Sequence, residues 1–155
     1  MEQRIFGFGQ TVMLCDVLGS MPDAVAYIKG DGISGEVQFY QTPLGVIVAV
    51  EVRGLPKSEH RIFAFHIHEG TDCGGEKFAS TKSHYNPTQT LHPNHAGDLP
   101  PLFSSDGYAL SVVLTDRFEV KEIKGKTVVI HSGVDDFTSQ PAGNSGEKIA
   151  CGVIV

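Results

Sequence analysis

The sequence contains no tryptophan, only 3 cysteines and no long hydrophobic run. Its longest apolar stretch, residues 46–52 (VIVAVEV), includes a glutamate and is far shorter than the ~20 residues of a membrane-spanning helix. A membrane-embedded protein is therefore excluded. Three cysteines allow at most one internal disulfide. Because no C-x-x-C pair is present, a thiolate zinc site is not expected, and any bound metal must use histidine and carboxylate ligands.

Basic residues are also few, with 12 lysines and arginines against 18 aspartates and glutamates, for a formal net charge of -6. They form no cluster along the chain. Nucleic acids and anionic membrane surfaces require basic patches, so neither is expected as a partner. The N-terminal residues lack the charged, apolar and small-residue series of a signal peptide. A cytoplasmic location is expected for the chain as given, and an exported form if a leader has been removed.

Short segments rich in β-branched and aromatic residues recur along the chain. They lie at residues 24–30, 35–42, 45–52, 61–68, 108–115, 118–123, 126–131 and 148–155. Valine at positions 46, 48, 50 and 52 has the period of a strand with one buried face, and KGDGISGE (29–36) is typical of a hairpin turn. A chain of 155 residues suits one domain. The prediction is a single all-β domain, an antiparallel sandwich or barrel.

Histidine is concentrated in one part of the chain. In FAFHIHEG (63–70), His66 and His68 are two residues apart and would share one face of a strand. The alternative is that both are solvated surface residues. Residues 69–105 show no sustained strand or helix pattern, and a loop of this length is usually functional or disordered. Since it contains His84, His92, His95 and Asp98, a loop ordered by metal is the more attractive interpretation.

The candidate ligands divide into two sets. The three loop histidines and Asp98 match the donors that Zn²⁺ accepts in a closed tetrahedral site. His66, His68 and His131, at the end of KTVVIH, would suit copper, which accepts several imidazoles. Taken singly, His92 could be a solvated loop residue, Asp98 a turn former and His131 a core residue; His60 is interpreted as a surface residue.

At the level of motifs the chain resembles the copper–zinc superoxide dismutase family. The motifs are FHIHEG (65–70), HYNP (84–87), HAGDLPPL (95–102, in a bacterial form), VVIHSGVDD (128–136) and GNSGEKIACGVIV (143–155). The resemblance covers residues 24–155 and implies an eight-stranded antiparallel Greek-key β-sandwich or barrel with a long metal-binding loop. Residues 1–23 are an unmatched N-terminal extension, which could be a flexible arm, an extra strand or an interface element.

Site roles are also implied by this resemblance. Copper would be bound by His66, His68, His84 and His131, and zinc by His84, His92, His95 and Asp98, with His84 as a bridge. Asp135 would accept hydrogen bonds from His66 and His92. Cys73 and Cys151 would form the intrasubunit disulfide, leaving Cys15 free. The activity would be dismutation of superoxide to dioxygen and hydrogen peroxide by Cu(II)/Cu(I) cycling, in a protein that could be a homodimer.

The sequence departs from the family pattern near its active site. Lys148 stands where the family usually has an arginine, and a lysine lacks the planar fork that presents two donors to a small anion. Glu147 beside it makes the local field less favourable, and the segments His92–His95 and Asp136–Gly143 are shorter than in eukaryotic members. Reduced turnover is expected. The alternative is a non-catalytic zinc- or copper-binding protein of the same fold; a metal-free sandwich module would require every matched ligand to be accidental.

Overall fold

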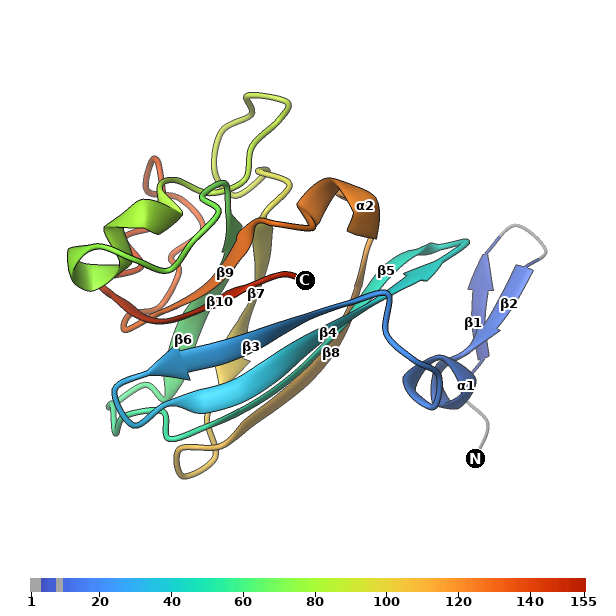
Figure 1. Ribbon diagram of the computed structural model, residues 1–155, viewed down its shortest axis with the longest axis horizontal. Helices are drawn as coiled ribbons and strands as arrows, with labels where there is room; N and C mark the ends of the chain where they lie inside the picture. The colour runs from blue at the N-terminus through green and yellow to red at the C-terminus, as the bar shows by residue number, and fades with distance from the viewer. Residues whose placement is uncertain (1–3, 8–9) are drawn as a thin grey trace.

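The computed structural model describes residues 4–7 and 10–155. Its elements are β1 (Arg4–Gly7), β2 (Gln10–Met13), α1 (Leu14–Leu18), β3 (Ala24–Gly30), β4 (Ser34–Thr42), β5 (Gly45–Arg53), β6 (Ile62–His68), η1 (Glu76–Thr81), β7 (Asp98–Phe103), β8 (Ala109–Thr115), α2 (Val120–Ile123), β9 (Thr127–His131) and β10 (Lys148–Val153). Strands β3–β10 form one antiparallel sheet in the order β7-β6-β9-β10-β3-β4-β5-β8. Because the edge strands β7 and β8 approach each other, the sheet is a nearly closed barrel (Figure 1). The all-β prediction is confirmed.

The interior of the barrel is filled by the alternating side chains that the sequence pattern indicates. Val46, Val48 and Val52 on β5 are completely buried, as are Phe39 on β4 and Phe63 on β6. Burying an aromatic or branched side chain contributes about 1.5–3 kcal/mol relative to exposure. The β3–β4 hairpin turns where the sequence predicts, with Gly32 at a positive φ of 69° that a side chain would disfavour.

The segment 118–123 contains a short helix, α2, and the prediction of a strand there is wrong. Glu119 caps this helix and Glu122 completes a capping box with the cap backbone. Val120 and Ile123 are both buried. A spacing of three puts them on one face of a helical turn, whereas in a strand they would point to opposite faces.

Strand β7 lies inside the segment that the sequence indicates to be structureless. Two prolines, which cannot donate to a β-ladder, hide it from a sequence pattern. The structure tolerates them because β7 is an edge strand, and because its pairing with β6 shifts register between Phe63 and Phe65. Beyond that irregularity Asp98 pairs with His66, so a carboxylate is placed beside the first strand histidine.

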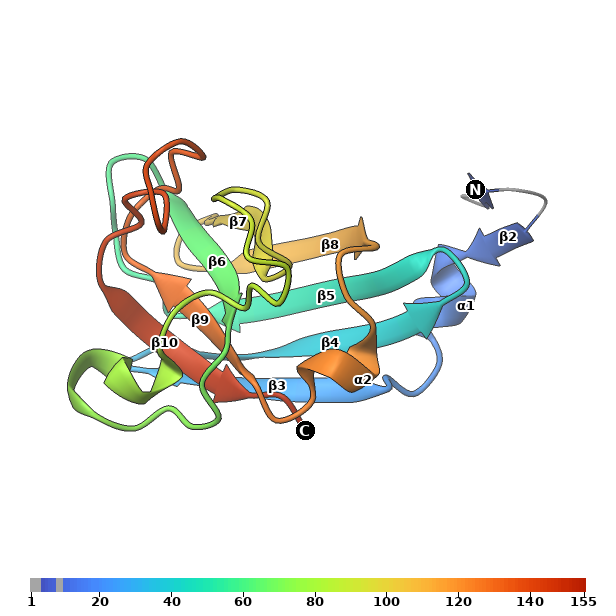
Figure 2. The same cartoon turned by 90° about the horizontal axis from the view of Figure 1, so that it is seen from above.

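The N-terminal extension forms its own small structure. Strands β1 and β2 pair as a two-stranded antiparallel sheet, separate from the eight-stranded one, and α1 follows directly. The hairpin stands clear of the barrel in both views (Figures 1 and 2). Residues 1–3 and 8–9 are outside the part of the chain that the structure describes, so the prediction of an arm, strand or interface element is not tested there. No helix within residues 4–7 and 10–155 has the length and apolar character needed to cross a bilayer.

Two long connections, the segment from β6 to β7 and the segment from β9 to β10, lie along the side of the barrel formed by β6, β9 and β10 (Figure 2). The predicted disulfide joins the first of them to the last strand, since Cys73 and Cys151 are bonded with Cα atoms 5.8 Å apart. Cys15 is exposed and free. The covalent link anchors the long loop to the barrel wall at β10.

Candidate metal centre

The two strand histidines point outward from the barrel, yet both are buried. Phe65 and Ile67 belong to the core, so His66 and His68 occupy the other face of β6. Their exposed fractions are 0% and 2%, because the long loops cover this face. The alternative of solvated surface histidines is therefore wrong. His60 is exposed and lies outside the cluster, as predicted.

The structure brings the predicted ligands together as two groups of four. The first consists of His66, His68, His84 and His131, and the second of His84, His92, His95 and Asp98. Within each group the candidate ligand atoms all lie within 4.8 Å of one another, and every member is buried. His84 belongs to both groups. Since β6, β7, β9 and the β6–β7 loop all contribute, the cluster depends on the folded barrel rather than on any one segment.

In the first group, the outward ring nitrogens are held by acceptors. The bonds join His66 Nε2 to Asp135 at 2.8 Å, His68 Nδ1 to the Lys82 carbonyl at 2.9 Å, and His131 Nδ1 to the Gly146 carbonyl at 3.4 Å. Because these oxygens only accept, the facing nitrogens carry the protons. His68 Nε2 and His131 Nε2 are then both unprotonated, and their lone pairs face each other across 3.2 Å. His66 Nδ1 is buried and has no hydrogen-bond partner.

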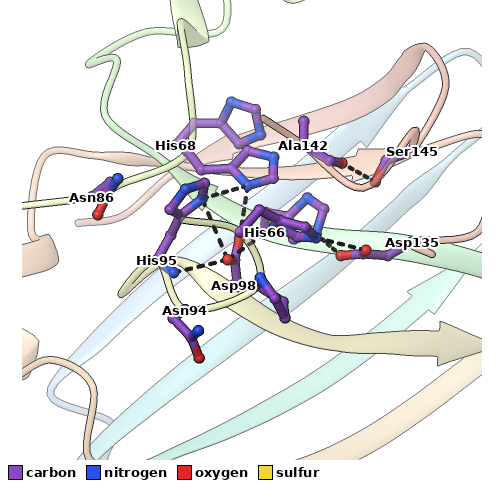
Figure 3. Close-up of polar contacts among 12 residues, drawn as sticks. His66, His68, Asn86, Asn94, His95, Asp98, Asp135, Ala142 and Ser145 are labelled. Atoms are coloured by element: carbon purple, nitrogen blue, oxygen red, sulfur yellow. Dashed lines mark hydrogen bonds and ion pairs between the residues drawn. The ribbon is translucent and has the colours of Figure 1, made fainter. Parts of the chain in front are cut away.

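In the second group, one carboxylate lies among three imidazoles. Asp98 is 2.7 Å from His84 Nδ1, 3.0 Å from His92 Nδ1 and 3.3 Å from His95 Nδ1. The His92 contact does not have hydrogen-bond geometry, so that nitrogen is unpaired. Figure 3 shows the Asp98 carboxylate directed toward the histidines. Burial raises the pKa of Asp98, but the hydrogen bond from His84 and the neighbouring imidazoles hold it below its usual value.

A second buried carboxylate, Asp135, bonds to one histidine of each group. Asp135 accepts from His66 Nε2 and from His92 Nε2, both at 2.8 Å, and also from the Phe137 backbone N–H. These bonds outweigh desolvation and lower the pKa of Asp135, so the carboxylate stays ionised. Outer carboxylates of this kind fix the tautomer and orientation of ligand histidines.

Burial keeps three of these histidines neutral, His66, His68 and His131, and the neutral form is the one that binds metal. Burial lowers the pKa of His68 to about 2 and that of His131 to about 3. It also lowers the pKa of His66, against the opposing effect of Asp135. Several imidazole lone pairs thus converge with no donor between them, an arrangement that costs free energy unless a cation is present.

The donor sets match the two metals that the sequence suggests. Four imidazole nitrogens suit copper, and three imidazoles with one carboxylate suit a closed zinc site. His84 uses Nδ1 in the second group, while its Nε2 is buried and unpaired. This leaves Nε2 for the first group, so one ring can serve both metals.

Lys148 lines the cavity that opens onto the first group, together with His68, His84 and His131. Its ammonium donates to Thr81 Oγ1 at 2.7 Å and to the Lys82 carbonyl at 2.9 Å, the same carbonyl that holds His68. Glu147, expected to weaken the field at the site, forms an ion pair with Lys77. Sequence reasoning missed Thr81, Lys82 and Lys77, because nothing local in the chain links them to residues 147–148.

Comparisons with known proteins agree with this geometry. A family model described as copper/zinc superoxide dismutase (SODC) matches residues 33–154. Among similar proteins, Cu-Zn superoxide dismutase 1 of Aquifex aeolicus is 37% identical over 95% of this chain and 99% of its own. Cu-Zn superoxide dismutase 2 of the same organism is 36% identical over 79% of each chain.

Solved structures with the same architecture come from Bacillus subtilis. A double mutant of a SOD-like protein superposes with a TM-score of 0.72 at 26% identity, covering 83% of this chain and 95% of that one. A second structure of a SOD-like protein has a TM-score of 0.74 at 24% identity and covers 84% and 97%. The latter likeness bears on the fold alone.

Proposed function

The chain belongs to the copper/zinc superoxide dismutase family, and we propose that it converts two superoxide anions and two protons into dioxygen and hydrogen peroxide. The observation that supports this most strongly is the shared ring of His84. It is buried, it belongs to both groups of four, and its Nε2 has no partner in the protein. A protein that merely stored zinc would have no need for a second group on the far side of this ring.

Some residues around the centre would hold metal, and one atom can carry a proton. When bound, copper supplies one-electron exchange with superoxide and zinc supplies a fixed positive charge. His66, His68 and His131 would hold copper, and their outer nitrogens are anchored so that the rings keep their orientation. His84 Nε2 is the atom that can carry a proton toward the substrate, since Nδ1 is committed to the second group.

Lys148 supplies the positive charge that attracts the substrate. An ammonium group has three donors, and two of them are used by Thr81 and the Lys82 carbonyl. One donor remains for a small anion, where an arginine would present a planar pair. The geometry supports an active enzyme with weaker anion capture, rather than loss of the reaction.

The decisive experiment measures superoxide dismutation by protein carrying one copper and one zinc per chain. We expect a copper-dependent rate that is lost in His84→Ala and kept in His60→Ala, a matched control outside both groups. Copper binding with a rate no higher than that of His84→Ala would refute the dismutase and favour the non-catalytic metal-binding alternative.

Three further properties stay predictions. The single domain is checked by one cooperative unfolding transition, and the homodimer by the mass of the protein in solution. The cytoplasmic location is checked by fractionating cells that produce the chain.

A further inference from the structure

The second ligand group sits on a loop that is held from outside by one arginine. Arg117 lies between β8 and α2, and its Nη1 is 2.8 Å from the Pro93 carbonyl, 3.2 Å from that of His95 and 3.3 Å from that of Asp98. Three peptide oxygens from one short loop therefore converge on one guanidinium nitrogen. Two of them belong to residues whose side chains are candidate ligands.

The charge of Arg117 is directed at these carbonyls. In the part of the chain that the structure describes, no carboxylate forms an ion pair with Arg117. Hydrogen bonds from a charged donor are about twice as strong as neutral ones. The backbone at Arg117 is held in place, because the next residue, Phe118, is buried in the core. Arg117 thus connects the loop to the barrel.

Gln140 holds the same loop at His92. Its amide donates to the His92 carbonyl at 2.7 Å and accepts from the His92 N–H at 3.0 Å. Both backbone groups of His92 are therefore paired by one side chain 48 residues away. The turn that carries Gln140 is itself fixed, since Asp136 accepts from the backbone of Thr138 and Ser139.

Neither side chain bonds to a candidate ligand atom. They bond to the backbone of His92, Pro93, His95 and Asp98, the segment that carries three of the four ligands of the second group. A loop that is ordered before the metal arrives does not have to lose conformational freedom on binding, which raises affinity.

We infer that Arg117 and Gln140 are positioning residues that hold the loop 92–98 in the geometry of a zinc site before zinc binds. The inference rests on the proposed function, because it takes the second group as the zinc site. Loss of either side chain should weaken zinc binding on the order of tenfold, as is usual for supports around metal ligands. Arg117→Lys should recover part of the loss, since an ammonium can reach one of the three carbonyls.

The test compares Arg117→Met, Arg117→Lys and Gln140→Met with wild type and with Arg53→Met, a matched exposed arginine bonded to Glu51 on the far strand β5. Zinc affinity is measured by competition with a coloured chelator. Co²⁺ is then used alone as a probe, because its visible spectrum reports the symmetry of a tetrahedral site. We expect weaker zinc binding and an altered cobalt spectrum in Arg117→Met and Gln140→Met, and neither effect in Arg53→Met.

Two results with the variants would overturn the inference while leaving the zinc site in place. One is zinc affinity and a cobalt spectrum equal to those of Arg53→Met. The other is lower stability of the metal-free variants with unchanged zinc affinity, which would make both residues general supports of the fold. Failure of the wild-type chain to bind zinc would overturn this inference together with the proposed zinc site. A missing dismutation rate in fully loaded protein would count against the proposed function alone.

Discussion

Replacing Gly143 by alanine should disconnect the carboxylate that links the two ligand groups. A Cβ at this position would lie 2.0 Å from Asp135 Oδ1 and 2.7 Å from His92 Nε2. An ordinary contact requires about 3.5 Å, so the carboxylate would have to move by about 1.5 Å. Its two hydrogen bonds to His66 and His92, both 2.8 Å long, would not survive that shift.

The size of the effect follows from those two bonds. A hydrogen bond to a charged group contributes about 1.5–3 kcal/mol to stability, so losing both should cost about 3–6 kcal/mol. Gly143 also has a positive φ of 67°, and an alanine there adds backbone strain of about 1–2 kcal/mol. Gly32 provides the matched control, because its φ is 69° and a methyl group added there would have nothing within 4 Å. The difference between the two variants isolates the contact with Asp135.

The assay is urea unfolding of the metal-free protein with its disulfide intact, followed by zinc titration. Gly143→Ala should be less stable than Gly32→Ala by about 3–6 kcal/mol, and its zinc affinity should fall about 10- to 100-fold as the His92 ring loses its support. Equal unfolding midpoints and equal zinc affinities would refute the reasoning. They would mean that the backbone at Gly143 gives way and that Asp135 keeps its place.

Three other outcomes follow from the structure. The metal-free protein should lose stability as the pH falls from about 6.5 toward about 3. In this range the unfolded chain binds protons at His68 and His131, whereas in the folded protein these histidines stay neutral because their pKa values are about 2 and 3. A urea midpoint that does not change across this range would contradict the prediction. Replacing both Cys73 and Cys151 by serine removes a covalent link across 78 residues and should lower the free energy of unfolding by about 4–5 kcal/mol. An unchanged melting temperature in the variant would count against that figure. Lys148→Met should lower the second-order rate constant with superoxide on the order of tenfold and weaken the dependence of that rate on salt. Lys148→Arg should raise the rate. Equal stopped-flow rates for these variants and wild type would exclude the ammonium as the group that attracts the anion.

The kind of fold and the kind of site follow from the order of residues along the chain. A residue's position in a strand decides its face, so the spacing of His66 and His68 was enough to pair them, and the valines of β5 were enough to indicate the core. The donor chemistry of histidine and aspartate was enough to suggest copper and zinc. These conclusions are local, because they depend on neighbours in the chain and on the properties of single side chains.

How those residues meet, and what supports them, depends on contacts between distant segments. The two prolines of β7 are acceptable at a sheet edge with a register shift, which no local pattern reveals, and so Asp98 proved to be on a strand. The contacts of Arg117 and Gln140 with the loop join segments distant in the chain. They exist because the barrel closes and brings these loops together, and closure is a property of the whole sheet rather than of any short stretch of sequence.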